Sequence, residues 1–414
     1  MFGSYHSFQL VICDILKFYL IILRLDAAGC FFACKVFCGG LYLAVVDINS
    51  YSTWLEIDLN AIRNNVAKIK DLTGVEVMAV IKANGYGHGA RPAAQAAVQG
   101  GATWCGVARI EEALALRRAG ISCKLLVLGY TPPSKIPEAI DQQIVVSLFD
   151  PDLAQSYLEF ARINSGILKA HVKVETGMGR LGMLPKDVAP FLKSLRGSPI
   201  SVEGIFTHFA QADEPQSDYT HKQIKRFNQL LAQLESADLK PQIVHAANSA
   251  AVFNFPEAWY DLVRPGDAIF GMAPSTQTLL GPDYLPALSW KARLISVRTY
   301  PAGSGISYGS KYVTSASERI GVMPIGYGDG FRRIDNQEVL VGGKRVRVVG
   351  RVCMDQCMLQ LDAVPEAKVG DEVVLIGTQG SETISVDEVA ARWSTINYEV
   401  VCGLADRLPR IYLE

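Results

Sequence analysis

The chain has 414 residues, enough for two or three domains and a large core. Its 40 Lys and Arg residues nearly balance 41 Asp and Glu, so no charge excess points to nucleic acid or an anionic membrane as a partner. Nine cysteines are present, but none forms a CxxC pair or a Cys/His spacing typical of zinc, so no metal site is expected. Their scatter favours a reducing compartment, the cytoplasm, over a disulfide framework.

Residues 1–50 form an extension unlike the rest of the chain. The run at residues 8–25 is strongly apolar, but Asp14 and Lys17 would each cost about 2.5–3.5 kcal/mol at the centre of a membrane-spanning helix. No basic start precedes the run, as a secretory signal requires. Three interpretations stay open: a poor membrane anchor, a targeting segment, or translated sequence upstream of a true start near Val45. We favour the third, which predicts that the extension is absent from the mature protein.

From Thr53 the pattern becomes regular. Residues 53–59 alternate like a strand, and Asn60 can cap a helix that buries Ile62, Val66 and Ile69. Eight apolar strand candidates follow, most of them separated by helical stretches, at residues 77–81, 104–108, 125–129, 144–148, 170–174, 202–206, 243–247 and 262–270. This alternation predicts a (β/α)8 barrel over residues 51–287. A doubly wound open sheet is the competing fold, but no GxGxxG follows an early strand.

Beyond Trp290 the residue pattern of the sequence changes. Short Val- and Ile-rich runs alternate with glycine turns, and only residues 385–393 have a helical pattern. Residues 288–414 are therefore expected to form a mostly β second domain.

Lys82 stands at the carboxyl end of the first barrel strand, followed by Gly85, Gly87 and Gly89. Barrel enzymes place their chemistry at this end of the strands. A lysine there, beside backbone that a ligand can approach closely, could be a desolvated amine that forms a Schiff base with a carbonyl. A solvated lysine that merely ends a strand is the alternative.

Other polar residues follow the later strands, and their positions favour the Schiff-base interpretation. They are Arg180 after the fifth strand, His208 after the sixth, Asn248 and Ser249 after the seventh, and Arg264 and Gly266 in the eighth. Each alone has a structural explanation, such as a core histidine or a turn. Together they place an amine, two guanidinium groups, an imidazole and an anion-binding turn at one rim, which suits an anionic aromatic cofactor.

Nine motifs make the chain similar to one known family. They are VIKANGYGHG, KVETGMGRLG, FTHFAQAD, HAANSAA, RPGDAIFG, SGISYGSKY, PIGYGDG, GRVCMDQ and NYEVVCGLADRLPR. From about Thr53 to Arg410 the chain resembles the alanine racemases. The resemblance implies a pyridoxal 5′-phosphate enzyme with a barrel and a β domain. It further implies a cytoplasmic homodimer that interconverts L- and D-alanine at interface sites and supplies D-alanine for bacterial peptidoglycan.

The resemblance also implies a role for each site residue. Lys82 would hold the cofactor aldehyde and act as one base, with the partner subunit's Tyr308 as the other. The cofactor phosphate would be held by Tyr86, Ser249, Gly266 and Tyr398, with Arg264 facing the pyridine nitrogen and His208 and Asn248 also at the cofactor. The substrate carboxylate would be bound by Arg180 and the backbone of Met354, with Tyr327 at the entrance. Lys173 matches a lysine that is carbamylated in some relatives.

The chemistry explains why these residue types are needed. Racemisation removes a proton from one face of a carbon atom and returns it on the other, which calls for two bases. Tyr308 has an ordinary pKa of about 10, and cationic neighbours, Arg264 with His208, would lower it. A permanent cation opposite the ring nitrogen disfavours a protonated pyridinium and so discourages transamination.

The chain departs from the family pattern at three positions. Glu175 replaces a common Asp, Gly85 replaces a frequent Ala, and Asp267 follows Gly266. An anion at Asp267 should repel phosphate unless its carboxylate points away.

Two other functions are kept as alternatives. A serine or broad-specificity racemase is one, although Tyr327 and Tyr398 favour a small substrate side chain. A non-catalytic pyridoxal-phosphate-binding barrel is the other, and Tyr308 with the CMDQ segment, both in the second domain, argue against it.

Overall fold

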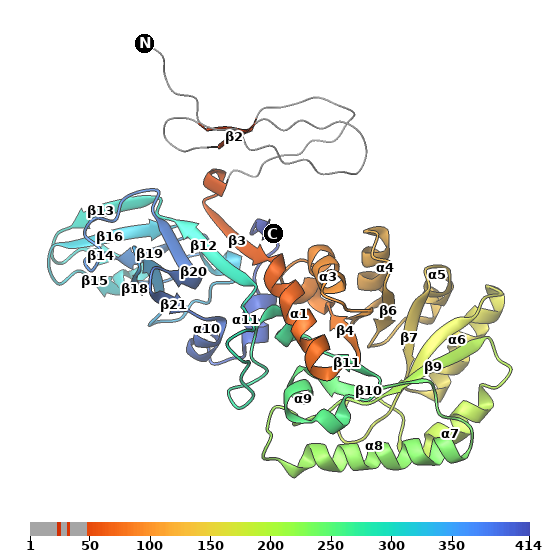
Figure 1. Ribbon diagram of the computed structural model, residues 1–414. Coiled ribbons are helices and arrows are strands. Elements are labelled where there is room, and N and C mark those ends of the chain that lie inside the picture. Colours follow the sequence, from red (N-terminus) through yellow and green to blue (C-terminus); the bar gives the residue numbers. More distant parts are fainter. Residues whose placement is uncertain (1–22, 26–30, 34–47) are drawn as a thin grey trace, which may run out of the picture. The chain divides into compact units, whose positions relative to one another are not determined.

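The computed structural model describes residues 23–25, 31–33 and 48–414 (Figure 1). The chain divides into two compact units, Met1–Tyr51 and Ser52–Glu414. In the first, β1 (Leu23–Leu25) pairs antiparallel with β2 (Phe31–Ala33), and a 3-10 helix, η1, covers Ile48–Ser50. Most of the apolar run at residues 8–25 lies outside the described residues, so its interpretations stay predictions. Among the helices that are described, none is both long and apolar enough to cross a membrane.

Eight parallel strands close into a barrel in the second unit, where β11 pairs with β4. This confirms the predicted barrel and excludes the open sheet. The strands are β4 (Glu76–Val80), β5 (Trp104–Val107), β6 (Lys124–Val127), β7 (Ile144–Leu148), β8 (Leu168–Lys173), β9 (Ile200–Phe206), β10 (Ile243–Asn248) and β11 (Leu262–Arg264).

Helices precede, connect and follow these strands (Figure 1). The α-helices are α1 (Leu59–Thr73), α2 (Lys82–Tyr86), α3 (Ala90–Gln99), α4 (Ile110–Arg118), α5 (Ile136–Asp141), α6 (Pro151–Ile163), α7 (Pro185–Ser194), α8 (Asp218–Ser236) and α9 (Ser249–Asn254). The 3-10 helices of this region are η2 (Pro133–Lys135), η3 (Pro256–Ala258) and η4 (Asp267–Phe270).

The barrel strands bury both of their faces, which explains their continuous apolar runs. Met78, Trp104 and Leu126 pack together in a small cluster, whereas their chain neighbours Val77 and Cys105 belong to the larger core. Successive side chains of a strand point to opposite faces, so one set fills the barrel and the other packs against the helices.

The structure corrects the prediction for the eighth strand. Residues 262–270 are not one strand, because β11 ends at Arg264 and η4 begins at Asp267. Pro265 has no backbone N–H to continue the strand pairing, although its carbonyl still accepts a hydrogen bond from the N–H of Val80 at 2.9 Å.

The cap of α1 also differs from the prediction. The side chain of Asp58, not Asn60, accepts the hydrogen bond from the N–H of Ala61 at 2.9 Å, and Asn60 lies inside the first turn. An aspartate just outside the first turn satisfies a helix N–H group as an asparagine would. The predicted buried face of α1 is confirmed, since Ile62, Val66 and Ile69 are fully buried.

The C-terminal region is mostly β, as predicted. One sheet has the order β13-β16-β19-β18-β17-β20-β12-β3-β22, with β21 paired to β20, and β14 and β15 form a separate hairpin. The strands are β12 (Leu288–Arg293), β13 (Ser296–Tyr300), β14 (Gly305–Ile306), β15 (Tyr312–Val313), β16 (Glu318–Met323), β17 (Glu338–Val341), β18 (Lys344–Val349), β19 (Cys357–Gln360), β20 (Glu372–Gln379), β21 (Glu382–Ile384) and β22 (Arg410–Leu413). Its helices are η5 (Tyr308–Ser310), η6 (Tyr327–Asp329), α10 (Val386–Arg392) and α11 (Asn397–Cys402), the last of which was not expected.

The strand β3 (Thr53–Asp58) belongs to this second sheet and not to the barrel. Ile57 pairs with Leu288 of β12 on one side, and Leu55 pairs with Arg410 of β22 on the other. The prediction that residues 51–287 form the barrel is therefore wrong for β3, whose partners in the sheet are far away in the chain. The chain therefore enters the barrel only at α1.

Candidate active site

The segment after β4, residues 82–87, is called here the Lys82 turn. Although this turn includes α2, its backbone is left-handed: φ is 52° at Ala83, 55° at Asn84, 51° at Tyr86 and 80° at Gly87. Each left-handed residue other than glycine costs about 1–2 kcal/mol. Such strain persists only where the surroundings impose it, and it concentrates at functional sites.

Contacts from three directions hold the Lys82 turn. The carboxylate of Glu112 in α4 accepts a hydrogen bond from the N–H of Ala83 at 2.7 Å, and the buried ring of His88 bonds the carbonyl of Tyr86 at 2.9 Å. Arg410 of β22 donates to the carbonyl of Gly87 at 2.8 Å. No sequence signal points to Glu112 or Arg410 as supports, because their contacts join distant segments.

Lys82 lies among other cations at the barrel rim. The Lys82 side chain is exposed to solvent. Its pKa is nevertheless lowered, first by desolvation of the amine and then by the charge of Arg180. Burial, followed by the charges of Arg180 and Arg264, lowers the pKa of Lys173 to about 8. Lys173 and Arg264 lie 5.6 and 5.4 Å from the ring centre of Phe206. This concentration of positive charge suits an anionic ligand.

Arg264 is buried and held by fixed acceptors. It donates to the carbonyls of Thr207 at 2.8 Å and Ala246 at 2.9 Å, and to Nδ1 of His245 at 3.0 Å. Since Nδ1 of His245 accepts, its other nitrogen carries the proton and donates to Nδ1 of His171 at 2.8 Å. Burial lowers the pKa of Arg264, but a guanidinium starts so high that it stays charged at neutral pH. Neither histidine is predicted as a site residue from the sequence, although both lie within predicted strands, in β8 and β10.

His208 lies beside Arg264, with its Nδ1 3.3 Å from a guanidinium nitrogen. Burial first, and then the charge of Arg264, hold the pKa of His208 well below its usual value. The imidazole is therefore neutral at pH 7. This corrects the expectation that His208 adds positive charge, and it leaves Arg264 as the cation of that pair.

Hydroxyl and N–H groups converge at the other side of the rim, around Gly266. The Ser249 hydroxyl accepts from the N–H of Gly266 at 2.8 Å, and the Tyr398 hydroxyl donates to Oδ2 of Asp267 at 2.5 Å. A Cβ added to Gly266 would lie 2.4 Å from the Tyr86 hydroxyl, so only glycine fits there. The carboxylate of Asp267 does not point away: it is buried among these groups.

Asn248 has a local role in the structure. Its side chain caps α9 by accepting from the N–H of Ala251 at 3.0 Å. This contact places Asn248 next to Ser249 at the rim but uses its carbonyl oxygen within the chain.

The loop that carries Arg180 is organised by Glu175. Its two carboxylate oxygens accept hydrogen bonds from four successive N–H groups, at distances from 2.5 to 3.3 Å, in Gly177, Met178, Gly179 and Arg180. Burial alone would raise the pKa of Glu175, but these bonds together lower it. The carboxylate thus fixes the backbone from which Arg180 extends.

Tyr308, Tyr327 and Met354 form a second, exposed group in the β domain. The N–H of Tyr327 bonds the carbonyl of Cys353 at 3.1 Å, which joins the Tyr327 and Met354 segments. Tyr308 lies between β14 and β15, which Figure 1 shows at the far end of the β domain from β4. Within one chain, the structure therefore does not bring Tyr308 to Lys82.

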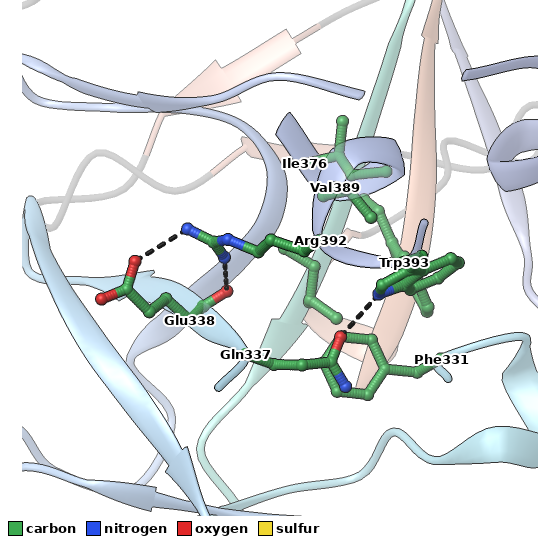
Figure 2. Close-up of a pocket in the computed structure, with 9 residues that line it drawn as sticks. Phe331, Gln337, Glu338, Ile376, Val389, Arg392 and Trp393 are labelled. Carbon is green, nitrogen blue, oxygen red and sulfur yellow. Dashed lines mark hydrogen bonds and ion pairs between the residues drawn. The ribbon is translucent and has the colours of Figure 1, made fainter. Parts of the chain in front are cut away.

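A small pocket in the β domain is unrelated to either group. Its volume is about 10 Å³, enough for about one water molecule. Figure 2 shows Trp393 donating to Gln337 at 2.7 Å and Arg392 paired with Glu338 at 2.7 Å. These contacts tie α10 to the sheet, so we assign the pocket a structural role. In the part of the chain that the structure describes, no cluster of side chains could hold a metal ion.

The fold and the site define a barrel enzyme with a lysine amine and an anion-binding rim, followed by a β domain. Residues 57–274 match the family described as alanine racemase, N-terminal domain, and residues 287–412 match alanine racemase, C-terminal domain. The chain belongs to the alanine racemase family and is an enzyme of the isomerase class.

Individual relatives agree with this assignment. The chain is 46% identical to an alanine racemase of Symbiobacterium thermophilum over 364 residues, covering 87% of this chain and 97% of the relative. It is 45% identical to that of Desulforamulus reducens over 367 residues, covering 87% and 98%. The solved structure of alanine racemase from Bacillus anthracis with bound L-Ala-P is 41% identical, with a TM-score of 0.83, and the match covers 88% of this chain and 95% of that one.

Proposed function

We propose that this protein is a pyridoxal 5′-phosphate-dependent racemase that interconverts L-alanine and D-alanine in the cytoplasm, supplying D-alanine for peptidoglycan. The observation that carries the proposal is Lys82, an amine of lowered pKa on a strained turn, facing cations and a rim of anion-binding donors. The family supports the substrate, and one solved relative is described with bound L-Ala-P.

The residues at the rim fit the cofactor. Tyr86, Ser249 and Tyr398 offer hydroxyl groups and Gly266 a close backbone approach, and the carboxylate of Asp267 already lies among two of these hydroxyls as an anion would. When bound, pyridoxal phosphate supplies an aldehyde that bonds covalently to a lysine and a ring that accepts electrons from the substrate.

Lys82 and the partner subunit's Tyr308 would be the two bases. The lowered pKa of Lys82 increases the fraction of neutral amine, which can take a proton at Nζ. Tyr308 is exposed, and the strands β14 and β15 that flank it lie far from β4 of the same chain (Figure 1), so a homodimer would supply it from the other side. The fixed charge of Arg264 would face the pyridine nitrogen.

Other residues would bind the substrate or position the groups that bind it. Arg180 and the backbone of Met354 would bind the carboxylate, and Tyr327 would line the entrance. Lys173, with a pKa of about 8, has neutral amine available near neutral pH. That amine could add carbon dioxide, lose a proton and become a carbamate whose charge holds Arg180.

A panel of amino acids tests the proposal. Purified protein with added pyridoxal phosphate should racemise alanine far faster than serine or larger amino acids, and protein stripped of cofactor should be inactive. Comparable rates for serine would favour the broad-specificity alternative. Cofactor binding without any racemisation would favour the non-catalytic alternative.

Replacing Glu175 by glutamine is expected to raise KM for alanine about tenfold, with little effect on kcat. The amide nitrogen cannot accept hydrogen bonds, so part of the Arg180 loop loses its acceptor, a loss of about 1–1.5 kcal/mol. Steady-state kinetics measure the effect. Glu235→Gln is the matched control, because Glu235 is exposed and pairs with Lys240 at the surface. An unchanged KM in Glu175→Gln would show that Glu175 does not position Arg180.

A further inference from the structure

We propose that Asp267 takes up a proton when the cofactor phosphate binds, so that this protein binds its cofactor more weakly as the pH rises. The inference rests on the proposed function, because it places the phosphate at the hydroxyl groups of Ser249 and Tyr398. It concerns a residue of this chain that the family pattern does not explain.

The carboxylate of Asp267 occupies the donors that a phosphate would need. Its side chain is 3% exposed, and Oδ2 accepts from the Tyr398 hydroxyl at 2.5 Å. The Ser249 hydroxyl and the N–H groups of Asp267 and Ala268 also lie close enough to lower the pKa of this carboxyl. An ionised carboxylate and a phosphate would therefore compete for the same hydroxyl groups inside a buried site.

Little positive charge is available to balance both anions. The polar groups facing Asp267 come from the Lys82 turn (Lys82, Tyr86), α11 (Tyr398) and α9 (Ser249), with Asn65 of α1 bonded to the carbonyl of Ile269 in η4. Lys82 is the cation among them. The pKa values of Tyr86 and Tyr398 are raised, first by burial and then by Asp267, so both phenols stay neutral. Asp213, near Tyr398, adds negative charge.

Burial favours the protonated form of Asp267. It raises the pKa of the carboxyl to about 6, against the opposing effect of its hydrogen bonds to Ser249 and Tyr398. A phosphate monoester carries a charge of about −1.5 to −2 at pH 7. A phosphate bound at the same hydroxyl groups would raise the pKa of Asp267 further, because two acidic groups that share a site cannot both ionise easily.

The direction of the pH effect follows from this linkage. Below pH 6 the carboxyl is already neutral in the free protein, so cofactor binding needs no additional proton. Above pH 6 the free protein carries a carboxylate, and binding must include one proton. Affinity then falls by up to about tenfold for each unit of pH.

The test compares the wild-type protein with Asp267→Asn, which keeps the shape of the side chain and removes the charge. The dissociation constant of pyridoxal phosphate is measured with cofactor-free protein between pH 5 and 9. The ratio of the wild-type to the Asp267→Asn constant should be flat below pH 6 and rise by up to about tenfold per pH unit above it. Titration of the phosphate affects both proteins and cancels in the ratio, whereas the effect of Asp267 on the pKa of Lys82 does not cancel and is measured with a second ligand.

Pyridoxal, which lacks the phosphate, is the control ligand: its ratio contains the effect of Asp267 on Lys82 alone, so the pyridoxal phosphate ratio should rise more steeply above pH 6 than the pyridoxal ratio. Calorimetry of the wild type in two buffers of different ionisation enthalpy provides a second measurement that needs no variant. At pH 8 it should show up to one more proton taken up with pyridoxal phosphate than with pyridoxal.

A pyridoxal phosphate ratio that rises no more steeply than the pyridoxal ratio, or equal proton uptake with the two ligands, would overturn the inference and mean that the carboxylate turns aside. That result is distinct from failure of the proposed function. If the proposed function fails, neither the wild type nor Asp267→Asn forms a borohydride-reducible bond between Lys82 and pyridoxal phosphate at any pH.

Discussion

Replacing Lys82 by alanine is expected to abolish covalent cofactor attachment and to lower racemisation by more than about a thousandfold. The variant loses both the amine that bonds the aldehyde and one of the two bases, and a single general base typically contributes 10²–10⁴-fold. The fold should persist, because Glu112, His88 and Arg410 hold the backbone of the Lys82 turn, to which the lysine side chain adds a contact of 5.8 Å with the centre of the Tyr86 ring.

Borohydride reduction followed by peptide mapping measures the attachment. In the wild type the label should be on the peptide that contains Lys82, and in the variant it should be missing. Lys169→Ala is the matched control, since Lys169 is an exposed barrel lysine that pairs with Glu203 on the surface. A labelled lysine at any other position in the wild type would refute the assignment.

Tyr308→Phe is expected to lower kcat by about 10²–10⁴-fold while leaving covalent cofactor attachment intact, because it removes only the second base. Mixing this variant with Lys82→Ala should restore activity. In a mixed dimer, the Lys82→Ala subunit supplies its tyrosine to the site that retains Lys82. With random exchange of equal amounts, half of the dimers are mixed and each has one intact site, so activity should rise from near zero to roughly a quarter of the wild-type value.

A double variant, Lys82→Ala with Tyr308→Phe, provides the opposite control. Mixed with an equal amount of wild type, it should reduce the activity of the mixture by about half as exchange proceeds, because every mixed dimer contains two defective sites. If the single variants fail to complement although mixed dimers are detected, both bases come from one chain. The two mixtures together separate that result from a lack of subunit exchange.

Much of the barrel could be predicted because its signals are local. The eight strands are three to seven residues long, and most of them are apolar and buried on both faces, so composition marked most of them. The errors arise where tertiary contacts decide. Residues 268–270 are as apolar as a strand, but Pro265 ends the pairing and the segment packs in a 3-10 helix. β3 has an ordinary strand pattern, and nothing in it tells which sheet it joins.

The site was predictable in its residue types but not in its electrostatics. Spacing after the strands placed Lys82, Arg180, Arg264 and Ser249 at one rim, because parallel strands of a barrel share one carboxyl end. The neutrality of His208 depends on burial beside Arg264, which no sequence pattern displays. The inward carboxylate of Asp267 likewise depends on Tyr398, which lies 131 residues further along the chain.

The position of β3 has a consequence for how the chain is made. β3 lies between β12 and β22 in the sheet, yet a ribosome releases it about 230 residues before β12 and earlier still than β22. At roughly 5–20 residues per second, it waits for tens of seconds without its partners while the barrel is being synthesised. A nascent chain therefore has a completed barrel sequence attached to an unpaired strand, Thr53–Asp58, whose Leu55 and Ile57 are buried only at the end. Formation of the β domain is thus a late, long-range closure that joins the two ends of the second unit, and a chain that terminates before Arg410 would leave β3 with an open edge.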